Sequence, residues 1–271
     1  MRRSISFLTL VCLATAGTLP ASDRDDEVLA RARQLHLEFR QGNLQTIDPL
    51  VKSLETAAAQ SPGNGDLWQA LGNAYMSQQG QLFQSQPDPA VLIAVGERAR
   101  DAYARALALD KKNALLLGSH GMAGMSISLL KQDPPGLRAS IEEMNAAVRQ
   151  APRSTLVRLT RGFSIIHLPV GLRDTAAATE DLKLVMENAP GGRPEDVLHV
   201  LLGDVYAEIG ELDTARGEYE QVTGASSFAA EQSRSRLDDL KKGAVSPASI
   251  ALVRGGTGYR CAMCHAPGTD N

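Results

Sequence analysis

The chain has 271 residues and carries 28 Lys and Arg residues against 31 Asp and Glu residues, a formal net charge of -3. A mildly acidic chain without a basic patch repels phosphate backbones, so we expect no nucleic-acid partner. The length allows either one large domain or an array of small units.

The first residues are typical of a secretory signal peptide. Arg2 and Arg3 precede an apolar stretch from Ile5 to about Leu19, and we expect cleavage after Ala16 or Ala21, so that residues 1–21 form the signal. The alternative is an uncleaved membrane anchor, but about fifteen apolar residues fall short of the roughly 20 that cross a bilayer. We therefore expect a periplasmic or otherwise exported protein of the bacterial cell envelope, with no membrane span after signal cleavage.

Residues 26–242 show the periodicity of helices. Apolar residues recur at helical spacing, no convincing alternating strand is present, and prolines such as Pro62, Pro152 and Pro190 follow the apolar runs and end them. The pattern predicts an all-α array of helix–turn–helix repeats. We expect five pairs at about 26–61, 65–112, 113–152, 154–190 and 195–225, with a capping helix near 228–242.

Two of these pairs share a set of small and aromatic residues. The fifth pair contains Leu202, Gly203, Tyr206, Ala215, Tyr219 and Val222, and the second contains Trp68, Leu71, Gly72 and Tyr75, then Ala99, Tyr103 and Ala106. In these residues the sequence resembles the tetratricopeptide repeat (TPR), a pair of antiparallel helices whose small residues allow close approach. The resemblance implies a TPR-like solenoid or irregular bundle that docks protein partners, possible redox proteins among them.

Two details of the second pair follow from this resemblance. Trp68 occupies a position that faces the second helix of its own pair, so we expect it to be a buried packing residue. A Gln-rich insertion from Gln78 to Pro89 separates the two helices of the pair.

The most specific motif lies in the last residues, after an expected linker at 243–258. Cys261-Ala262-Met263-Cys264-His265 has the C-x-x-C-H spacing of c-type haem attachment. Cys261 and Cys264 would each form a thioether bond to one haem, and His265 would be the proximal iron ligand. Signal cleavage removes Cys12, which leaves the two motif cysteines alone in the mature chain. We therefore expect one covalent haem c on a tail at 259–271.

Three other interpretations of this motif are open. A C-x-x-C pair can be a redox site, but the chain before it shows no thioredoxin-like alternation of strands and helices. A structural zinc site needs four ligands, and this segment offers three at most. The third interpretation is a chance occurrence of the spacing.

The segment 258–268 resembles the opening of a class I cytochrome c domain. That family supplies a Met ligand from far downstream, whereas this sequence stops at Asn271, so only the attachment residues carry over. The sixth iron ligand would then be water, another chain, or one of His36, His120, His167 and His199. We favour His120 as a distal ligand because Gly118, Gly121 and Gly124 surround it; close helix packing is the other use of such glycines.

The sequence thus predicts an exported TPR-like scaffold that carries one covalent c-type haem and docks partner proteins for electron transfer. The alternative is an envelope adaptor or transport-associated TPR protein whose haem is structural or sensory. We find no catalytic constellation, so we expect no enzymatic activity.

Overall fold

The computed structural model describes residues 21–40, 44–83, 87–166, 168, 172–188, 193–224 and 228–245. Within these ranges the chain forms eleven α-helices and one short 3-10 helix, and no strand. The all-α class expected from the sequence is therefore confirmed. In chain order the elements are α1 (Ala21–Arg40), η1 (Leu44–Thr46), α2 (Ile47–Gln60), α3 (Gly65–Phe83), α4 (Pro89–Leu109), α5 (Ala114–Lys131), α6 (Pro134–Gln150), α7 (Thr155–Ile166), α8 (Thr175–Asn188), α9 (Arg193–Glu208), α10 (Leu212–Glu220) and α11 (Phe228–Lys241).

Local capping explains where several of these helices begin. The side chain of Asp88 accepts a hydrogen bond from the Ala90 amide before α4, and Asn113 accepts one from the Leu116 amide before α5. Asp133 caps α6 in the same way. Such side chains satisfy backbone amides that have no partner within the helix, which fixes the start of each helix.

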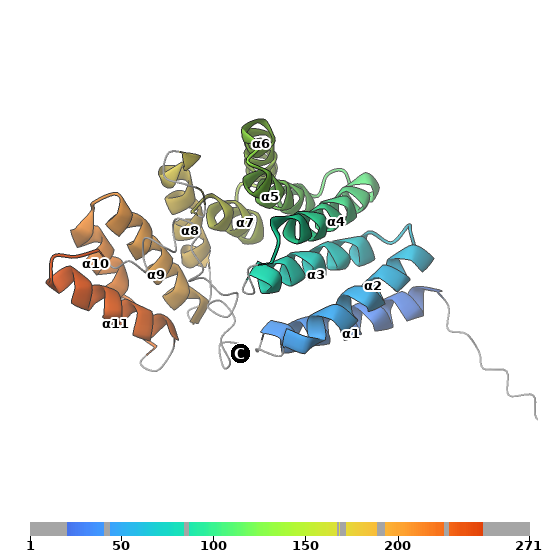
Figure 1. The fold of residues 1–271 in the computed structure, drawn as a ribbon, viewed down its shortest axis with the longest axis horizontal. Helices are drawn as coiled ribbons and strands as arrows, with labels where there is room; N and C mark the ends of the chain where they lie inside the picture. Colours follow the sequence, from blue (N-terminus) through green and yellow to red (C-terminus); the bar gives the residue numbers. More distant parts are fainter. Residues whose placement is uncertain are drawn as a thin grey trace, which may run out of the picture.

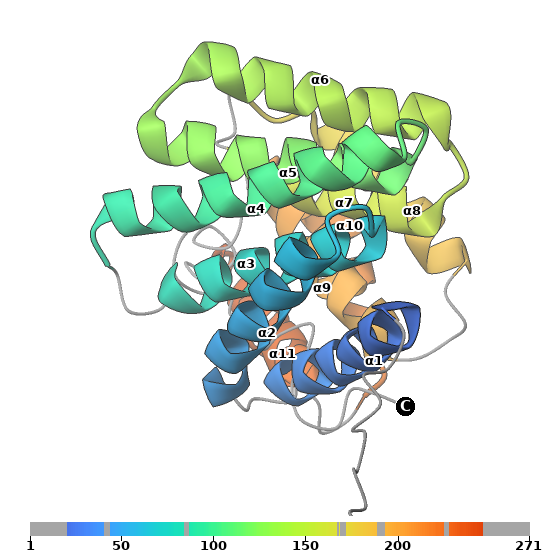
Figure 2. The same ribbon diagram turned by 90° about the vertical axis from the view of Figure 1, so that its right-hand side faces the viewer.

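The helices pack as consecutive antiparallel pairs. The pairs are α1–α2, α3–α4, α5–α6, α7–α8 and α9–α10, and α11 packs on both α9 and α10. Figure 1 shows the pairs following one another along an arch, with α5 and α6 at its top and the first and last pairs at its two lower ends. In the view of Figure 2, α4, α5 and α6 run side by side across the upper part of the molecule.

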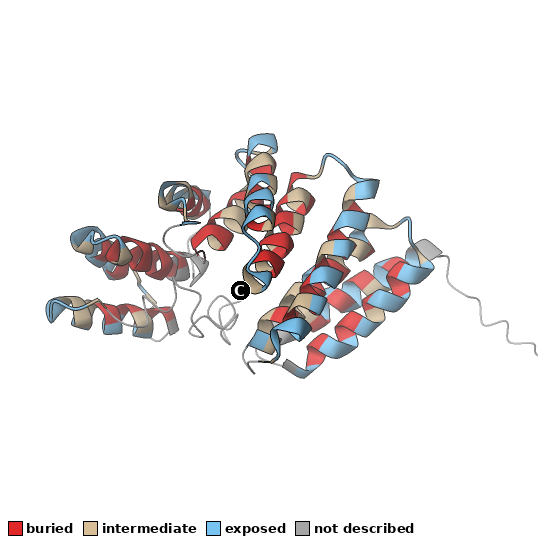
Figure 3. Cartoon of the chain, turned by 45° about the horizontal axis from the view of Figure 1, so that its top comes forward, coloured by how far each residue is buried: buried red, intermediate tan, exposed pale blue. Residues whose placement is uncertain are grey.

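The core runs along the stack between neighbouring helices, as the buried inner faces in Figure 3 show. One group of buried side chains joins α1 to α5, and a second joins α5 to α11. Glycines allow the closest approaches: a Cβ atom on Gly72 would lie 2.6 Å from the Tyr103 ring, and one on Gly203 would overlap the Tyr219 ring. These two pairs therefore use their small residues as the sequence predicted.

Two expectations about the second pair were wrong. Trp68 is only partly buried, although it packs against the core. The helix α3 also continues past Gln78 to Phe83. It can do so because Gln79, which is 2% exposed, donates to the Leu92 carbonyl at 2.8 Å and accepts from Ser126 at 3.0 Å. These bonds tie the end of α3 to α4 and α5.

Candidate functional site

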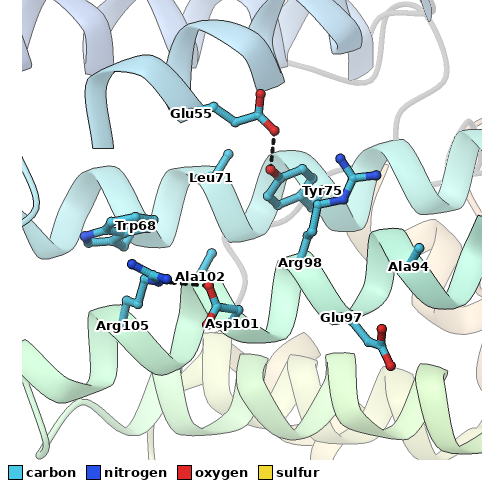
Figure 4. Close-up of a pocket in the computed structure, with 10 residues that line it drawn as sticks. All are labelled: Glu55, Trp68, Leu71, Tyr75, Ala94, Glu97, Arg98, Asp101, Ala102 and Arg105. Carbon is cyan, nitrogen blue, oxygen red and sulfur yellow. Dashed lines mark hydrogen bonds and ion pairs between the residues drawn. The ribbon is translucent and has the colours of Figure 1, made fainter. Parts of the chain in front are cut away.

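A groove crosses α3 between α2 and α4, and we call it the α2–α4 groove. It encloses about 590 Å³, and Figure 4 shows the side chains that line it. These are Glu55 from α2, then Trp68, Leu71 and Tyr75 from α3, and Ala94, Glu97, Arg98, Asp101, Ala102 and Arg105 from α4.

Two arginines of α4 lie over two aromatic rings of α3. The guanidinium carbon of Arg105 is 4.7 Å from the Trp68 ring centroid, and that of Arg98 is 5.3 Å from the Tyr75 centroid. The two rings are two helical turns apart on α3, as are the two arginines on α4, so the two contacts are about 10 Å apart along the groove. Stacking on a ring holds a guanidinium in place and leaves its edge free to donate.

Hydrogen bonds fix the two rings. The indole Nε1 of Trp68 donates to the Pro62 carbonyl at 3.0 Å, and the hydroxyl of Tyr75 donates to Glu55. Burial, together with the bond to Glu55, raises the pKa of Tyr75 to about 12. Tyr75 therefore stays a neutral donor at neutral pH, and the groove has a fixed aromatic wall.

The charges that line the groove differ in their partners. Asp101 pairs with Arg105 at 2.8 Å, and Glu97 pairs with Lys131 of α5 at 2.5 Å. Arg98 is exposed and makes no ion pair with any residue in the described part of the chain. Arg98 is thus the cation of the groove best placed to meet an external anion.

The structure places His120 in a polar contact between three helices. Its Nδ1 is 2.7 Å from Glu143 of α6, and its Nε2 accepts from Nε of Arg100 of α4 at 3.3 Å. The neighbouring glycines pack against α6, since a Cβ on Gly121 would lie 2.8 Å from the Ser140 carbonyl. Iron ligation by His120 stays a prediction, and it requires the contact with Arg100 to be lost.

The other candidate haem ligands and the motif residues occupy different places in the chain. His199 lies on α9 with its Nδ1 2.8 Å from Glu218 of α10. His36 is partly buried on α1. His167, Cys261, Cys264 and His265, together with the linker beyond Val245 and residues 1–20 of the signal segment, lie outside the described residues. Haem attachment and signal cleavage therefore stay predictions.

The described residues contain neither a metal-ligating cluster nor a membrane-spanning helix. No group of three or more His, Cys, Asp or Glu side chains there could hold a metal ion. None of the helices in those ranges is long and apolar enough to cross a membrane.

The groove itself was not predicted from the sequence. Its signal was present, because Trp68 and Tyr75 share one face of their helix, and Arg98 and Arg105 share one face of the next. What was missing was the register of α3 against α4, which places Trp68 opposite Arg105 and Tyr75 opposite Arg98.

Known proteins resemble this chain in its fold and not in its sequence. No family model matches the chain, and no curated protein is detectably similar to it. Among solved structures, a thermophilic TPR protein from Thermus thermophilus is similar, with a TM-score of 0.57 at 15% sequence identity, over 79% of this chain and 97% of that one. The pilF structure from Pseudomonas aeruginosa aligns with 15% identity over 78% of this chain and 99% of its own, but its TM-score of 0.27 is too low to carry an argument. The chain thus has the fold of a TPR-like helical array.

Proposed function

We propose that this chain is an exported docking scaffold that carries one covalent c-type haem on its C-terminal tail. The observation that carries the docking role is the α2–α4 groove, with its fixed aromatic wall and the exposed Arg98, on a TPR-like fold. The observation that carries the haem is the C-x-x-C-H spacing in a chain with no cysteine between the signal segment and the motif.

The groove suits a segment of a partner protein that has an acidic side chain next to an apolar one. Its apolar lining consists of Leu71, Ala94 and Ala102, and the exposed Arg98 lies over the Tyr75 ring. A carboxylate that meets a pre-oriented guanidinium makes a charge-assisted hydrogen bond at low entropic cost. Two of the three carboxylates that line the groove are paired with cations, Asp101 with Arg105 and Glu97 with Lys131, while Glu55 accepts a hydrogen bond from Tyr75.

The haem would be held by thioether bonds to Cys261 and Cys264, with His265 as the proximal ligand. A bound c-type haem supplies one-electron redox chemistry at its iron. In this proposal the helical array brings the partner to the tail, and the N-terminal segment directs the protein to the cell envelope. The array needs no catalytic residue for this role.

The haem is tested with the full-length chain, expressed in a bacterium that matures c-type cytochromes. We expect the mature protein to gain the mass of one haem, which survives acid–acetone extraction. The double variant Cys261→Ala and Cys264→Ala should lose this haem and keep its helical circular dichroism, since the motif lies outside the repeat array. A wild-type protein without covalent haem would leave the envelope adaptor as the better function.

The docking role is tested by a photo-crosslinking amino acid at Ala94, in the groove, and at Arg138, an exposed position on α6. We expect a partner adduct only from position 94, with an acidic residue in or beside the cross-linked peptide. Arg98→Glu should abolish the adduct, and the matched charge reversal Arg138→Glu should preserve it. An adduct that persists in the Arg98→Glu protein contradicts the proposed groove.

A further inference from the structure

A buried carboxylate joins α1 to the turn between α2 and α3. Asp25 of α1 is 7% exposed, and it accepts hydrogen bonds from the Ser61 hydroxyl at 2.9 Å and from Nδ2 of Asn64 at 3.0 Å. Both donors are neutral. Because α1 packs on α2 and α3, these two bonds hold the first helix against the start of the array.

The side chain of Asn64 has two separate roles. Its Oδ1 accepts from the amides of Asp66 at 3.1 Å and Leu67 at 3.4 Å, so it caps α3, while its Nδ2 donates to Asp25. Aspartate caps a helix about as well as asparagine, and its charge is favourable at a helix N-terminus. Only the contact with α1 therefore requires an amide at position 64.

Asn64 and Gly65 form the only Asn-Gly step in the sequence. Asparagine before glycine is the asparagine most prone to lose its side-chain ammonia, because no Cβ hinders the backbone nitrogen that follows it. Packing does not account for this glycine, since a Cβ on Gly65 would lie 3.8 Å from Leu109 in ordinary contact, and Gly65 has no positive φ. The step thus combines reactive chemistry with a contact that depends on the amide.

We propose that Asn64 is a site of spontaneous deamidation whose product releases α1 from the array. The nitrogen of Gly65 bonds to Cγ of Asn64 and gives up its proton, and Nδ2 leaves with that proton as ammonia. Water then opens the succinimide ring at one of its two carbonyl carbons, so residue 64 becomes aspartate or isoaspartate. The reaction consumes only water, and it depends on neither the haem nor the docking role.

The product carboxylate would face the carboxylate of Asp25. A carboxylate only accepts hydrogen bonds, so residue 64 loses its bond to Asp25, and two negative charges repel where an amide had donated at 3.0 Å. While α1 is docked, the bonds to Asp25 and to the α3 amides fix the Asn64 side chain and slow the reaction. Local opening of α1 exposes the side chain, and deamidation then makes that opening permanent.

The modification is tested on the full-length protein in mildly alkaline buffer, by peptide mass spectrometry and an isoaspartate assay. We expect Asn64 to be the main site. Asp25→Ala should speed its loss several-fold, and Gly65→Ala should slow it several-fold. The matched control Gly63→Ala, where an added Cβ meets nothing within 4 Å, should leave the rate unchanged. Equal rates in wild type and Asp25→Ala, or no modification in either, overturn the inference.

The release of α1 is tested by hydrogen–deuterium exchange on freshly purified full-length protein. Asn64→Asp should lower the protection of the α1 amides several-fold and leave that of α3 unchanged. The double variant Asp25→Asn and Asn64→Asp exchanges the amide and the carboxylate between the two positions, so it should restore the protection of α1. Wild-type protection of α1 in Asn64→Asp, or no recovery in the double variant, overturns the inference.

Discussion

The second and fifth helical pairs bring their two helices together through the same contact, a tyrosine ring against a glycine. In each pair a tyrosine of the second helix lies over a glycine of the first: Tyr103 over Gly72, and Tyr219 over Gly203. Both tyrosines are almost completely buried. The shared contact shows which residues the TPR-like fold requires at these positions.

The tyrosine hydroxyls differ in their partners. The hydroxyl of Tyr103 donates to the amide oxygen of Asn73 at 2.8 Å, and Asn73 is exposed. Tyr219 donates at 2.7 Å to Asp204, which is fully buried and also pairs with Arg236 of α11 at 2.5 Å. In the fifth pair, the buried carboxylate of Asp204 therefore binds the capping helix α11 through Arg236. The second pair has a neighbouring pair on each side, because α3 packs on α2 and α4 packs on α5.

The surfaces of the two pairs differ as well. Trp68 of the second pair corresponds to His199 of the fifth, and the helix before each pair places a charged residue beside the matching tyrosine, Glu55 of α2 and Lys183 of α8. Glu55 accepts from the Tyr75 hydroxyl, while the ammonium of Lys183 lies 5.6 Å from the ring centroid of the corresponding Tyr206. The two pairs thus differ outside the shared glycine–tyrosine contact, and Trp68 and Glu55 both line the α2–α4 groove.

The largest expected effect comes from the buried ion pair. Asp204→Ala leaves Arg236 buried without its partner, which typically costs about 3–5 kcal/mol of unfolding free energy. Asn73→Ala removes one hydrogen bond at the surface and should cost only about 0.5–1.5 kcal/mol. Chemical denaturation followed by circular dichroism measures both. Equal losses in the two variants would contradict the different roles assigned to the hydroxyl partners.

The shared glycine–tyrosine contact is tested by adding one methyl group. Gly72→Ala and Gly203→Ala force a Cβ against a buried ring, and such overpacking should cost about 1–3 kcal/mol. The control is Gly217→Ala on α10, where nothing lies within 4 Å of the added Cβ. Because alanine is the better helix former, this variant should gain up to about 1 kcal/mol. A gain in stability at all three positions would refute the close approach.

A smaller effect is expected at the aromatic wall of the second pair. Arg105→Ala removes the guanidinium over Trp68, a contact worth about 0.5–1 kcal/mol at an exposed site. Because Trp68 is the sole tryptophan, its fluorescence should become more accessible to an added quencher. Arg138→Ala on α6 is the control, and unchanged quenching in both variants would argue against the stacked geometry.

The least stability change is expected from reversing the exposed charge of Glu55 beside Tyr75. Glu55→Lys places beside Tyr75 a positive charge like that of Lys183 beside Tyr206, and it removes an interaction that raises the pKa of Tyr75. The pKa of Tyr75 should fall from about 12 towards its ordinary value of 10.0, which the ultraviolet absorbance of tyrosinate measures. A titration identical to that of the wild type would exclude the contact with Glu55.

The same pKa determines the sign of the alkaline response. A folded-state pKa above the unfolded value stabilises the fold below pH 10.0, and this stabilisation is lost as the pH rises to about 12. Burial also raises the pKa of Tyr103, which adds to the loss. The wild-type protein should therefore become easier to denature across this range, and Tyr75→Phe should reduce the change.

The sequence by itself determined the helical pairs, because apolar spacing, capping side chains and prolines act within a few residues of one another. It also marked Gly72 and Gly203 as small positions and supplied the haem motif, which stays a prediction. The tertiary structure alone decided the extent of α3, because Gln79 finds its partners on α4 and α5. It alone showed the α2–α4 groove and gave His120 and His199 different partners. These features depend on which side chains meet across helices, and local periodicity holds no information about that register.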